Sequence, residues 1–202
     1  DLADGKLRIN AAIFNNQYED LQRTVVGPDG FQTVSNAADA TIQGAELELS
    51  WLIADSLLFQ ANFGYVDAEI EDFVNPRGGA GGAPLIVDGT KMPFVPEWQR
   101  DFSLTYDKQI GNGNLTVRAA YHYVDDVEST DDNLGYQGDD YTETDATISY
   151  APDSGKWRVT LFGKNLSDDI KSSLITNAAN PGWILNQARM PKRYGVEVLF
   201  EF

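Results

Sequence analysis

The feature that most constrains this chain is an alternation of apolar and polar residues with a period of two, which recurs in about eight runs. Successive side chains of a β-strand point to opposite faces, so each run predicts a strand with one apolar and one polar face. The runs cover residues 6–18, 40–53, 57–70, 99–109, 115–126, 141–150, 156–164 and 194–202. Helical periodicity is nearly absent, and the sequence therefore predicts an all-β protein with antiparallel strands.

The connections between these runs are alternately short and long. The short ones are rich in turn-forming residues and span residues 54–56, 111–114 and 152–155. The long ones are rich in Gly and Pro, acidic, or rich in Asn and Ala, and span residues 73–97, 127–140 and 168–190. A soluble sandwich has no reason for this order, whereas outer-membrane barrels have short periplasmic turns and longer external loops.

Aromatic residues on the apolar faces support a membrane wall. Five of them lie within a few residues of a short turn, namely Trp51, Phe59, Tyr106, Tyr150 and Trp157. Amphipathic rings are favoured at membrane interfaces, so these residues predict an aromatic girdle. The apolar face from Leu115 to Tyr123 would rise roughly 20 Å, close to the apolar band of such barrels. Alternation alone also describes a soluble antiparallel sheet, but the aromatic placement favours a transmembrane β-barrel.

Composition excludes several classes of function. The net charge is −16, with 31 Asp and Glu against 15 Lys and Arg, which argues against nucleic-acid binding. No Cys is present, so a disulfide framework and a thiolate metal site are excluded. No stretch reaches the roughly 20 apolar residues of a membrane helix. The mean hydropathy of −0.34 is compatible with a barrel, because only alternate residues of its strands face lipid.

Three motifs resemble those of TonB-dependent outer-membrane receptors. Residues 41–48 (Thr-Ile-Gln-Gly-Ala-Glu-Leu-Glu) resemble the Gly-x-Glu-x-Glu strand of that family. Residues 161–168 (Leu-Phe-Gly-Lys-Asn-Leu-Ser-Asp) resemble its strand that ends in Asn-Leu-x-Asp. Residues 190–195 (Met-Pro-Lys-Arg-Tyr-Gly), followed by a strand that ends in Phe202, resemble its C-terminal motif, with Lys and Arg slightly displaced. The order of the motifs makes residues 1–202 similar to the C-terminal portion of such a barrel.

This resemblance implies a barrel of about 22 strands around a plug, of which the chain supplies about the last eight. The plug and the segment that contacts TonB would precede Asp1, where no signal peptide is found. The implied function is TonB-dependent uptake of a scarce ligand such as a ferric siderophore, with no enzymatic activity and no cofactor. The alternative is a self-contained barrel of eight strands with a structural or adhesive role.

The resemblance also implies a location and partners. The chain would lie in the outer membrane of a Gram-negative cell, with its C-terminus in the periplasm. Expected partners are membrane lipid and lipopolysaccharide, TonB, the barrel-assembly machinery and the transported ligand. The signal read by the assembly machinery would be the alternating apolar residues of the last strand, Tyr194, Val198, Phe200 and Phe202.

Two sets of loop residues are candidate binding residues. Phe94, Trp98 and Trp183 lie in or beside long connections, where they would contact ligand or pack one loop against another. The acidic loop offers oxygen ligands for Ca²⁺ at Asp125, Asp126, Glu128, Asp131 and Asp132. This loop lacks the spacing of an EF-hand, so the alternatives are a solvated acidic loop or divalent ions that bridge to lipopolysaccharide.

Candidate catalytic residues are few. Glu46 and Glu48 share the polar face of one strand, where a hydrated wall, with Arg8 as a neighbour, is the simpler interpretation than an acid–base pair. His122 is the only His and shares a polar face with Arg118. A single His without a nucleophile motif gives an enzyme hypothesis little support.

Overall fold

The computed structural model describes residues 4–26, 32–71, 73–75, 85–86, 89–128, 137–178 and 183–201. Its main sheet follows the chain as an antiparallel meander, and each of the predicted runs falls on one of its long strands. These strands are β1 (Leu7–Val26), β2 (Gln32–Ala54), β3 (Leu57–Glu71), β7 (Trp98–Ile110), β8 (Gly113–Val124), β11 (Tyr141–Pro152), β12 (Trp157–Lys164) and β15 (Arg193–Phe200). The prediction of an all-β antiparallel fold is therefore confirmed.

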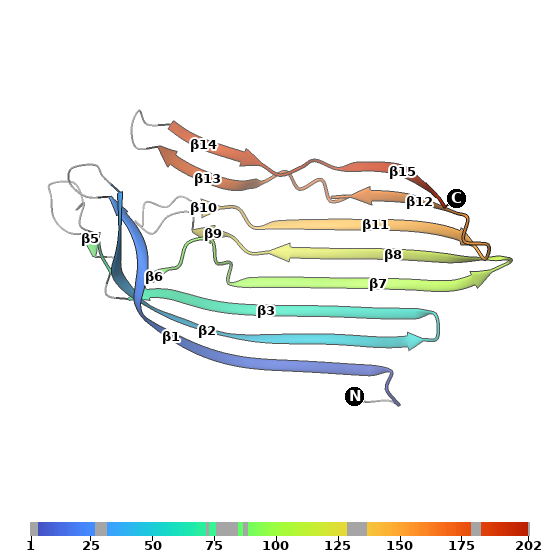
Figure 1. The fold of residues 1–202 in the computed structure, drawn as a ribbon, viewed down its shortest axis with the longest axis horizontal. Coiled ribbons are helices and arrows are strands. Elements are labelled where there is room, and N and C mark those ends of the chain that lie inside the picture. The colour runs from blue at the N-terminus through green and yellow to red at the C-terminus, as the bar shows by residue number, and fades with distance from the viewer. Residues whose placement is uncertain are drawn as a thin grey trace.

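Shorter strands lie at one end of this sheet. The strand β6 (Thr90–Lys91) pairs with β3. Three small hairpins are formed by β4 (Val74–Asn75) with β5 (Leu85–Ile86), β9 (Val127–Glu128) with β10 (Gln137–Gly138), and β13 (Ser172–Ala178) with β14 (Trp183–Ala188). Figure 1 shows these hairpins and the long connections at one end, and the tight turns at the other. β1 begins and β15 ends at the tight-turn end, which we call the turn end, the opposite end being the loop end.

The sheet is open within the described residues. Its hydrogen-bonded order runs from β1 to β15, and these two strands form its edges without pairing with each other. An unpaired edge is untenable in lipid, so such a sheet is part of a larger barrel wall. The alternative prediction, a closed barrel of eight strands, does not fit this sheet, because β1 and β15 do not pair. No helix among the described residues is long and apolar enough to cross a membrane.

The strand register separates an apolar face from a polar face across the whole sheet. Residues paired directly across antiparallel strands lie on the same face. On the apolar face, Ile148 lies opposite Val117 and Leu161, and Leu161 lies opposite Val196. Many large side chains of this face are exposed, including Ile13, Trp51, Leu104, Ile148, Leu161, Tyr194 and Val196. A continuous exposed apolar surface of this kind is what a wall facing lipid requires.

Aromatic residues on the polar face cover glycines of the neighbouring strand. A Cβ added at Gly44 would lie 2.6 Å from Phe14 Cζ, and one added at Gly195 would lie 2.7 Å from Phe162 Cζ. Gly44 and Gly195 both belong to motifs that resemble the receptor family. Phe162 interrupts the polar alternation of its strand because its ring occupies the space that Gly195 leaves open. Such packing of a ring on a glycine stabilises a curved sheet.

The hairpin of β1 and β2 extends well beyond the predicted runs, to Val26 and from Gln32. An irregularity in its register occurs near Asp20, whose φ is 58° and whose N–H donates to Asp39 Oδ1 at 3.0 Å. A small apolar core packs Ala38 of this extension against Ile70 near the end of β3 and Phe73 just after it. The extension therefore has its own packing, which an irregular external loop would not have.

Candidate functional site

The polar face of the wall carries a row of side chains that continues across six strands. The row consists of Asn10, Glu48, Asn62, Asp101, His122 and Glu143, each paired with the next. The row is rich in carboxylates, and the apolar face has none at this level of β7 and β8. The polar face is therefore the face that a barrel would turn towards its water-filled interior.

His122 is fixed between two neighbouring strands. Its Nδ1 lies 2.6 Å from Asp101 Oδ1 on β7, and its Nε2 lies 3.1 Å from the Tyr141 hydroxyl on β11. Both ring nitrogens are thus occupied by polar contacts that join β8 to the strands on either side. The His122 ring therefore links three neighbouring strands of the wall. Its contacts do not form the pair of nucleophile and base that a hydrolase needs.

A cavity of about 380 Å³ opens on the polar face beside His122. Its polar lining is Gln60, Asn62, Asp101, Ser103, Arg118, His122, Glu143 and Asp145. Asp145 Oδ2 accepts a hydrogen bond from Lys164 Nζ at 2.5 Å, so part of its charge is compensated. Glu46 and Glu48 lie on the same face, and Glu48 Oε2 accepts the Asn10 side-chain amide at 3.2 Å. The lining is suited to hydrogen bonding with a polar partner.

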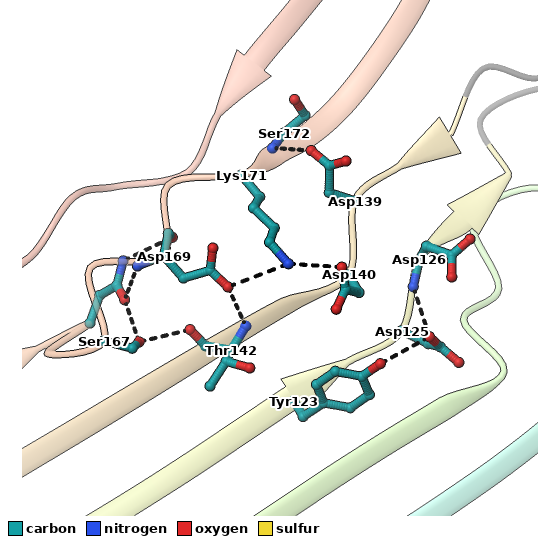
Figure 2. A network of polar contacts seen from close by, with 11 residues as sticks. Tyr123, Asp125, Asp126, Asp139, Asp140, Thr142, Ser167, Asp169, Lys171 and Ser172 are labelled. Atoms are coloured by element: carbon teal, nitrogen blue, oxygen red, sulfur yellow. Dashed lines mark hydrogen bonds and ion pairs between the residues drawn. The ribbon is translucent and has the colours of Figure 1, made fainter.

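A second polar cluster lies at the loop end, where the polypeptide leaves β12 (Figure 2). Lys171 Nζ donates to Asp140 Oδ1 at 2.8 Å and lies 3.9 Å from Asp169 Oδ2. Asp169 Oδ2 also accepts the Thr142 N–H at 3.0 Å. The hydrogen bond to Asp140 raises the pKa of Lys171 above its ordinary value. This cluster, which we call the rim network, fixes the base of the β13–β14 hairpin to β11.

Asn165 is the centre of the corner that follows β12. Its side chain is buried, and its φ of 48° is left-handed. Its Nδ2 donates to the carbonyl oxygens of Met190 at 2.9 Å and of Asp169 at 3.2 Å. Its Oδ1 accepts the Ser167 hydroxyl at 3.0 Å, and its N–H donates to Asp145 Oδ1 at 3.0 Å. The corner thus joins three separate segments of the chain.

A further cavity of about 310 Å³ lies between this corner and the entry to β15. Its charged lining residues are Glu143, Lys164, Asp169, Arg189 and Arg193. The central carbon of the Arg189 guanidinium lies 3.2 Å from the centre of the Tyr141 ring. Its Nε is buried and has no hydrogen-bond acceptor among the described residues. A buried donor of this kind is suited to a ligand oxygen.

The three aromatic candidates lie in different surroundings. Phe94 is 58% exposed, has a φ of 62° and follows β6 in the loop. Trp98 starts β7 on the apolar face, where the centre of its ring lies 4.8 Å from the centre of the Tyr65 ring. Trp183 starts β14 opposite Ala178. Their proposed contacts with ligand remain predictions; of Phe94 and Trp98, Phe94 is the one that lies outside a long strand.

The acidic loop is only partly described. Asp125 and Asp126 follow β8, Glu128 ends β9, and Asp131 and Asp132 lie outside the described residues. Burial, with the neighbouring Asp125, raises the pKa of Asp126. Asp125 Oδ1 accepts the Tyr123 hydroxyl at 3.0 Å (Figure 2). No group of three metal-ligating side chains is found in the described part of the chain, and Ca²⁺ binding by the full loop remains a prediction.

The last strand presents its predicted apolar residues outwards. Tyr194, Val198 and Phe200 are 81%, 49% and 60% exposed, and Phe202 lies outside the described residues. Val198 pairs with Val159, and Phe200 pairs with Trp157. The strand therefore continues the apolar face to the edge of the sheet.

Sequence reasoning missed Asn165 and Arg189 as individual residues. A left-handed corner with a buried side chain is invisible to a strand pattern, although the motif around Asn165 was recognised. Arg189 lies next to the C-terminal motif but shows no periodicity of its own. Its contact with Tyr141 depends on the return of the chain after the β13–β14 hairpin.

The whole arrangement matches a known family. Residues 1–166 fit the family model described as TonB dependent receptor-like, beta-barrel. The chain belongs to the TonB-dependent receptor family. Receptors of this family lie in the outer membrane of Gram-negative bacteria. Because its relatives are receptors, the prediction that the chain is not an enzyme is also confirmed.

Individual TonB-dependent receptors resemble the chain over nearly its whole length. The pesticin receptor of Yersinia pestis is 27% identical over 96% of the chain. The ferric yersiniabactin uptake receptor FyuA from Yersinia pestis superposes on 98% of it with a TM-score of 0.78 and 21% identity. The siderophore receptor PiuA from Acinetobacter baumannii covers 98% with a TM-score of 0.73 and 22% identity. The chain spans 27%, 28% and 26% of these three proteins, respectively.

Proposed function

We propose that the chain is the C-terminal wall of a TonB-dependent transporter that takes up a ferric siderophore. The observation that carries this proposal is the combination of a lipid-compatible outer face with a polar inner face that bears ligand-sized cavities. One similar structure is named a ferric yersiniabactin uptake receptor and another a siderophore receptor, which favours a ferric complex over other cargo. The plug and the TonB-contacting segment would lie upstream in the complete receptor.

The proposed orientation puts the loop end outside the cell and the turn end in the periplasm. Short turns on the periplasmic side and longer external loops are typical of outer-membrane barrels. β15 ends at the turn end, so the C-terminus would be periplasmic. Its outward residues, with Phe202, would be recognised by the barrel-assembly machinery.

The cavity at the Asn165 corner is the proposed ligand-facing part of this wall. Siderophores bind iron through oxygen donors, and their complexes are often anionic. Arg189 offers a buried N–H without an acceptor among the described residues, and Arg193 adds positive charge. Charge-assisted hydrogen bonds to such oxygens are among the stronger polar contacts in proteins.

Uptake of iron by cells tests this proposal. The complete receptor would be expressed in a bacterium that lacks its own siderophore receptors, and uptake of radioactive iron bound to yersiniabactin would be measured. We expect uptake that disappears when TonB is deleted. Arg189→Gln should reduce the apparent affinity about tenfold. A receptor that reached the outer membrane but took up neither this complex nor ferric complexes of other siderophore classes would contradict the proposed function.

A further inference from the structure

Arg100 breaks the apolar character of the outward face near the loop end. It pairs with Phe63 on β3 and with Tyr123 on β8, so all three side chains lie on the same outward face. Phe102 and Tyr121, one step towards the turn end, continue that face. A charged side chain on the lipid side costs about 2–4 kcal/mol at the membrane midplane but little near the interface. Its position therefore needs an explanation in terms of depth and partner.

The neighbours of Arg100 place it at the outer limit of the apolar band. Tyr123 pairs on its other side with Thr142 of β11, where the outward face has become polar. Two residues before Arg100, Trp98 begins β7, and the chain beyond it is loop. An Arg at this level lies where lipid headgroups begin, and its long side chain can reach them.

Two aromatic rings hold the guanidinium group in place. Its central carbon lies 5.1 Å from the centre of the Trp98 ring and 5.3 Å from that of Tyr123. Stacking on rings uses the faces of a guanidinium and leaves the N–H donors along its edge available. No carboxylate among the described residues forms an ion pair with Arg100. The guanidinium is therefore held by its two rings, without an ion-pair partner in the described part of the chain.

The surface around this group suits a lipid better than a soluble ion. An open hollow of about 530 Å³ is lined by Phe63, Trp98, Arg100, Phe102 and Tyr121. Apart from the guanidinium, the lining is dominated by aromatic rings that can pack against an acyl chain. A phosphate held by the guanidinium would thus have its hydrocarbon chains on the adjoining apolar surface.

We propose that Arg100, flanked by Trp98 and Tyr123, binds a phosphate group of an outer-leaflet lipid on the outer surface of the barrel. The ligand class is a phosphorylated glycolipid of the lipid A type, because the outer leaflet faces the loop end in the proposed orientation. The inference rests on that orientation, which belongs to the proposed function, and it is independent of which ligand the receptor transports.

Lys108 provides a matched control on the same strand. It shares the outward face with Arg100 but pairs with Leu115, at the turn end of β7. Eight residues of strand separate the two cations, which corresponds to roughly 26 Å along the strand. Lys108 would therefore lie at the opposite interface and should have no effect on a lipid of the outer leaflet.

The test measures binding of lipid A to the complete receptor in a zwitterionic detergent by native mass spectrometry. The probes are lipid A with two phosphates and the same lipid after removal of both. We expect Arg100→Gln to weaken binding of the phosphorylated lipid about tenfold, Arg100→Lys to weaken it less, and Lys108→Gln to leave it unchanged. We also expect the dephosphorylated lipid to bind wild type and Arg100→Gln alike. Heat-modifiable migration on gels verifies that each variant is folded.

A second variant tests the site without altering Arg100. Asp125 accepts the Tyr123 hydroxyl and adds negative charge close to the proposed phosphate position. Asp125→Asn keeps an oxygen acceptor and should tighten binding of phosphorylated lipid A about two- to threefold. Equal binding of this lipid by wild type, Arg100→Gln and Asp125→Asn would overturn the proposal. Its displacement by millimolar inorganic phosphate would do so as well, because the site would then be one for soluble anions.

The two proposals fail in different experiments. Iron uptake by Arg100→Gln at the wild-type rate, together with weakened lipid A binding, supports both. Loss of the lipid effect with intact uptake refutes the lipid site alone. Absence of uptake by a receptor that still binds lipid A through Arg100 refutes the ligand assignment alone.

Discussion

The side-chain amide of Asn165 donates a hydrogen bond of 2.9 Å to the carbonyl oxygen of Met190, 25 residues later in the chain. This contact joins the end of β12 to the segment that enters β15. It also links two of the recognised motifs, because the side-chain amide of Asn165 in one motif donates its hydrogen bond to a backbone carbonyl of the other. The β13–β14 hairpin emerges between them and is closed at its base by this contact.

Replacement of Asn165 should destabilise the wall. Asn165→Ala loses the buried side-chain hydrogen bonds and keeps a left-handed φ, so the free energy of unfolding should fall by about 2–4 kcal/mol. Asn165→Gly relieves the backbone strain and should recover about 1 kcal/mol of that loss. Urea unfolding of the complete receptor in detergent, followed by tryptophan fluorescence, measures both values.

Asn62 provides the control for this prediction. It lies on the polar face within β3 and is exposed, so Asn62→Ala should change the free energy of unfolding by less than about 0.5 kcal/mol. Equal losses for Asn62→Ala and Asn165→Ala would show that the corner has no special role.

Gly44 should be far less tolerant of a methyl group than Gly64. A Cβ at Gly44 would clash with the Tyr65 carbonyl oxygen and lie 2.6 Å from Phe14 Cζ, whereas a Cβ at Gly64 meets nothing within 4 Å. Gly44→Ala should lower the free energy of unfolding by about 1–3 kcal/mol, because backbone and ring must shift. Gly64→Ala should leave it unchanged or raise it. A heat-modifiability series on gels compares the two, and equal melting temperatures would contradict the prediction.

Sequence reasoning succeeded where a repeated pattern carries the structure. Alternation fixed which face each residue of β8 occupies, because a slip by one residue would turn Val117 and Tyr121 towards water. The tight turns near Asp55 and Asp153 were recognisable from their residue types. Eight separate runs with alternating connection lengths left little freedom in the order of the strands.

The same reasoning failed where single residues decide the structure. Residues 19–39 lack a clear alternation, so the long β1–β2 extension with its irregularity near Asp20 was not predicted. The corner at Asn165 depends on contacts with residues far away in the chain. Strand parity puts Arg100 on the face of Phe102, but one charge in an apolar series is easily overlooked without the rings beside it.

Lys171 predicts an alkaline limit for the rim network. Its hydrogen bond to Asp140 raises the Lys171 pKa above the ordinary 10.5, so this contact stabilises the folded state below that pH. The stabilisation is lost as the pH rises through the raised pKa, when the ammonium group becomes neutral. A nitroxide attached through Ala188→Cys should therefore keep its mobility from pH 7 to 10 and gain mobility above about pH 10.5.

Lys171→Gln serves as the reference for this titration. The variant cannot form the charged contact, so its nitroxide should be mobile at every pH and should show no alkaline step. A step of the same size in Lys171→Gln would assign the transition to another group. The chain contains no Cys, so within it the label attaches at the chosen position alone.

Phe94 and Trp98 should differ in their effect on iron uptake, although they lie only four positions apart. Phe94 is exposed in the loop after β6, whereas the Trp98 ring packs on Tyr65 and against Arg100 on the outward face. Phe94→Ala should raise the concentration of ferric yersiniabactin needed for half-maximal uptake about five- to tenfold, since a buried aromatic contact contributes about 1 kcal/mol or more. Trp98→Ala should leave that concentration within about twofold, while it weakens lipid A binding by removing one ring beside Arg100. The reverse pattern, with uptake impaired by Trp98→Ala alone, would mean that the outward face of β7 takes part in transport and that the loop aromatic does not.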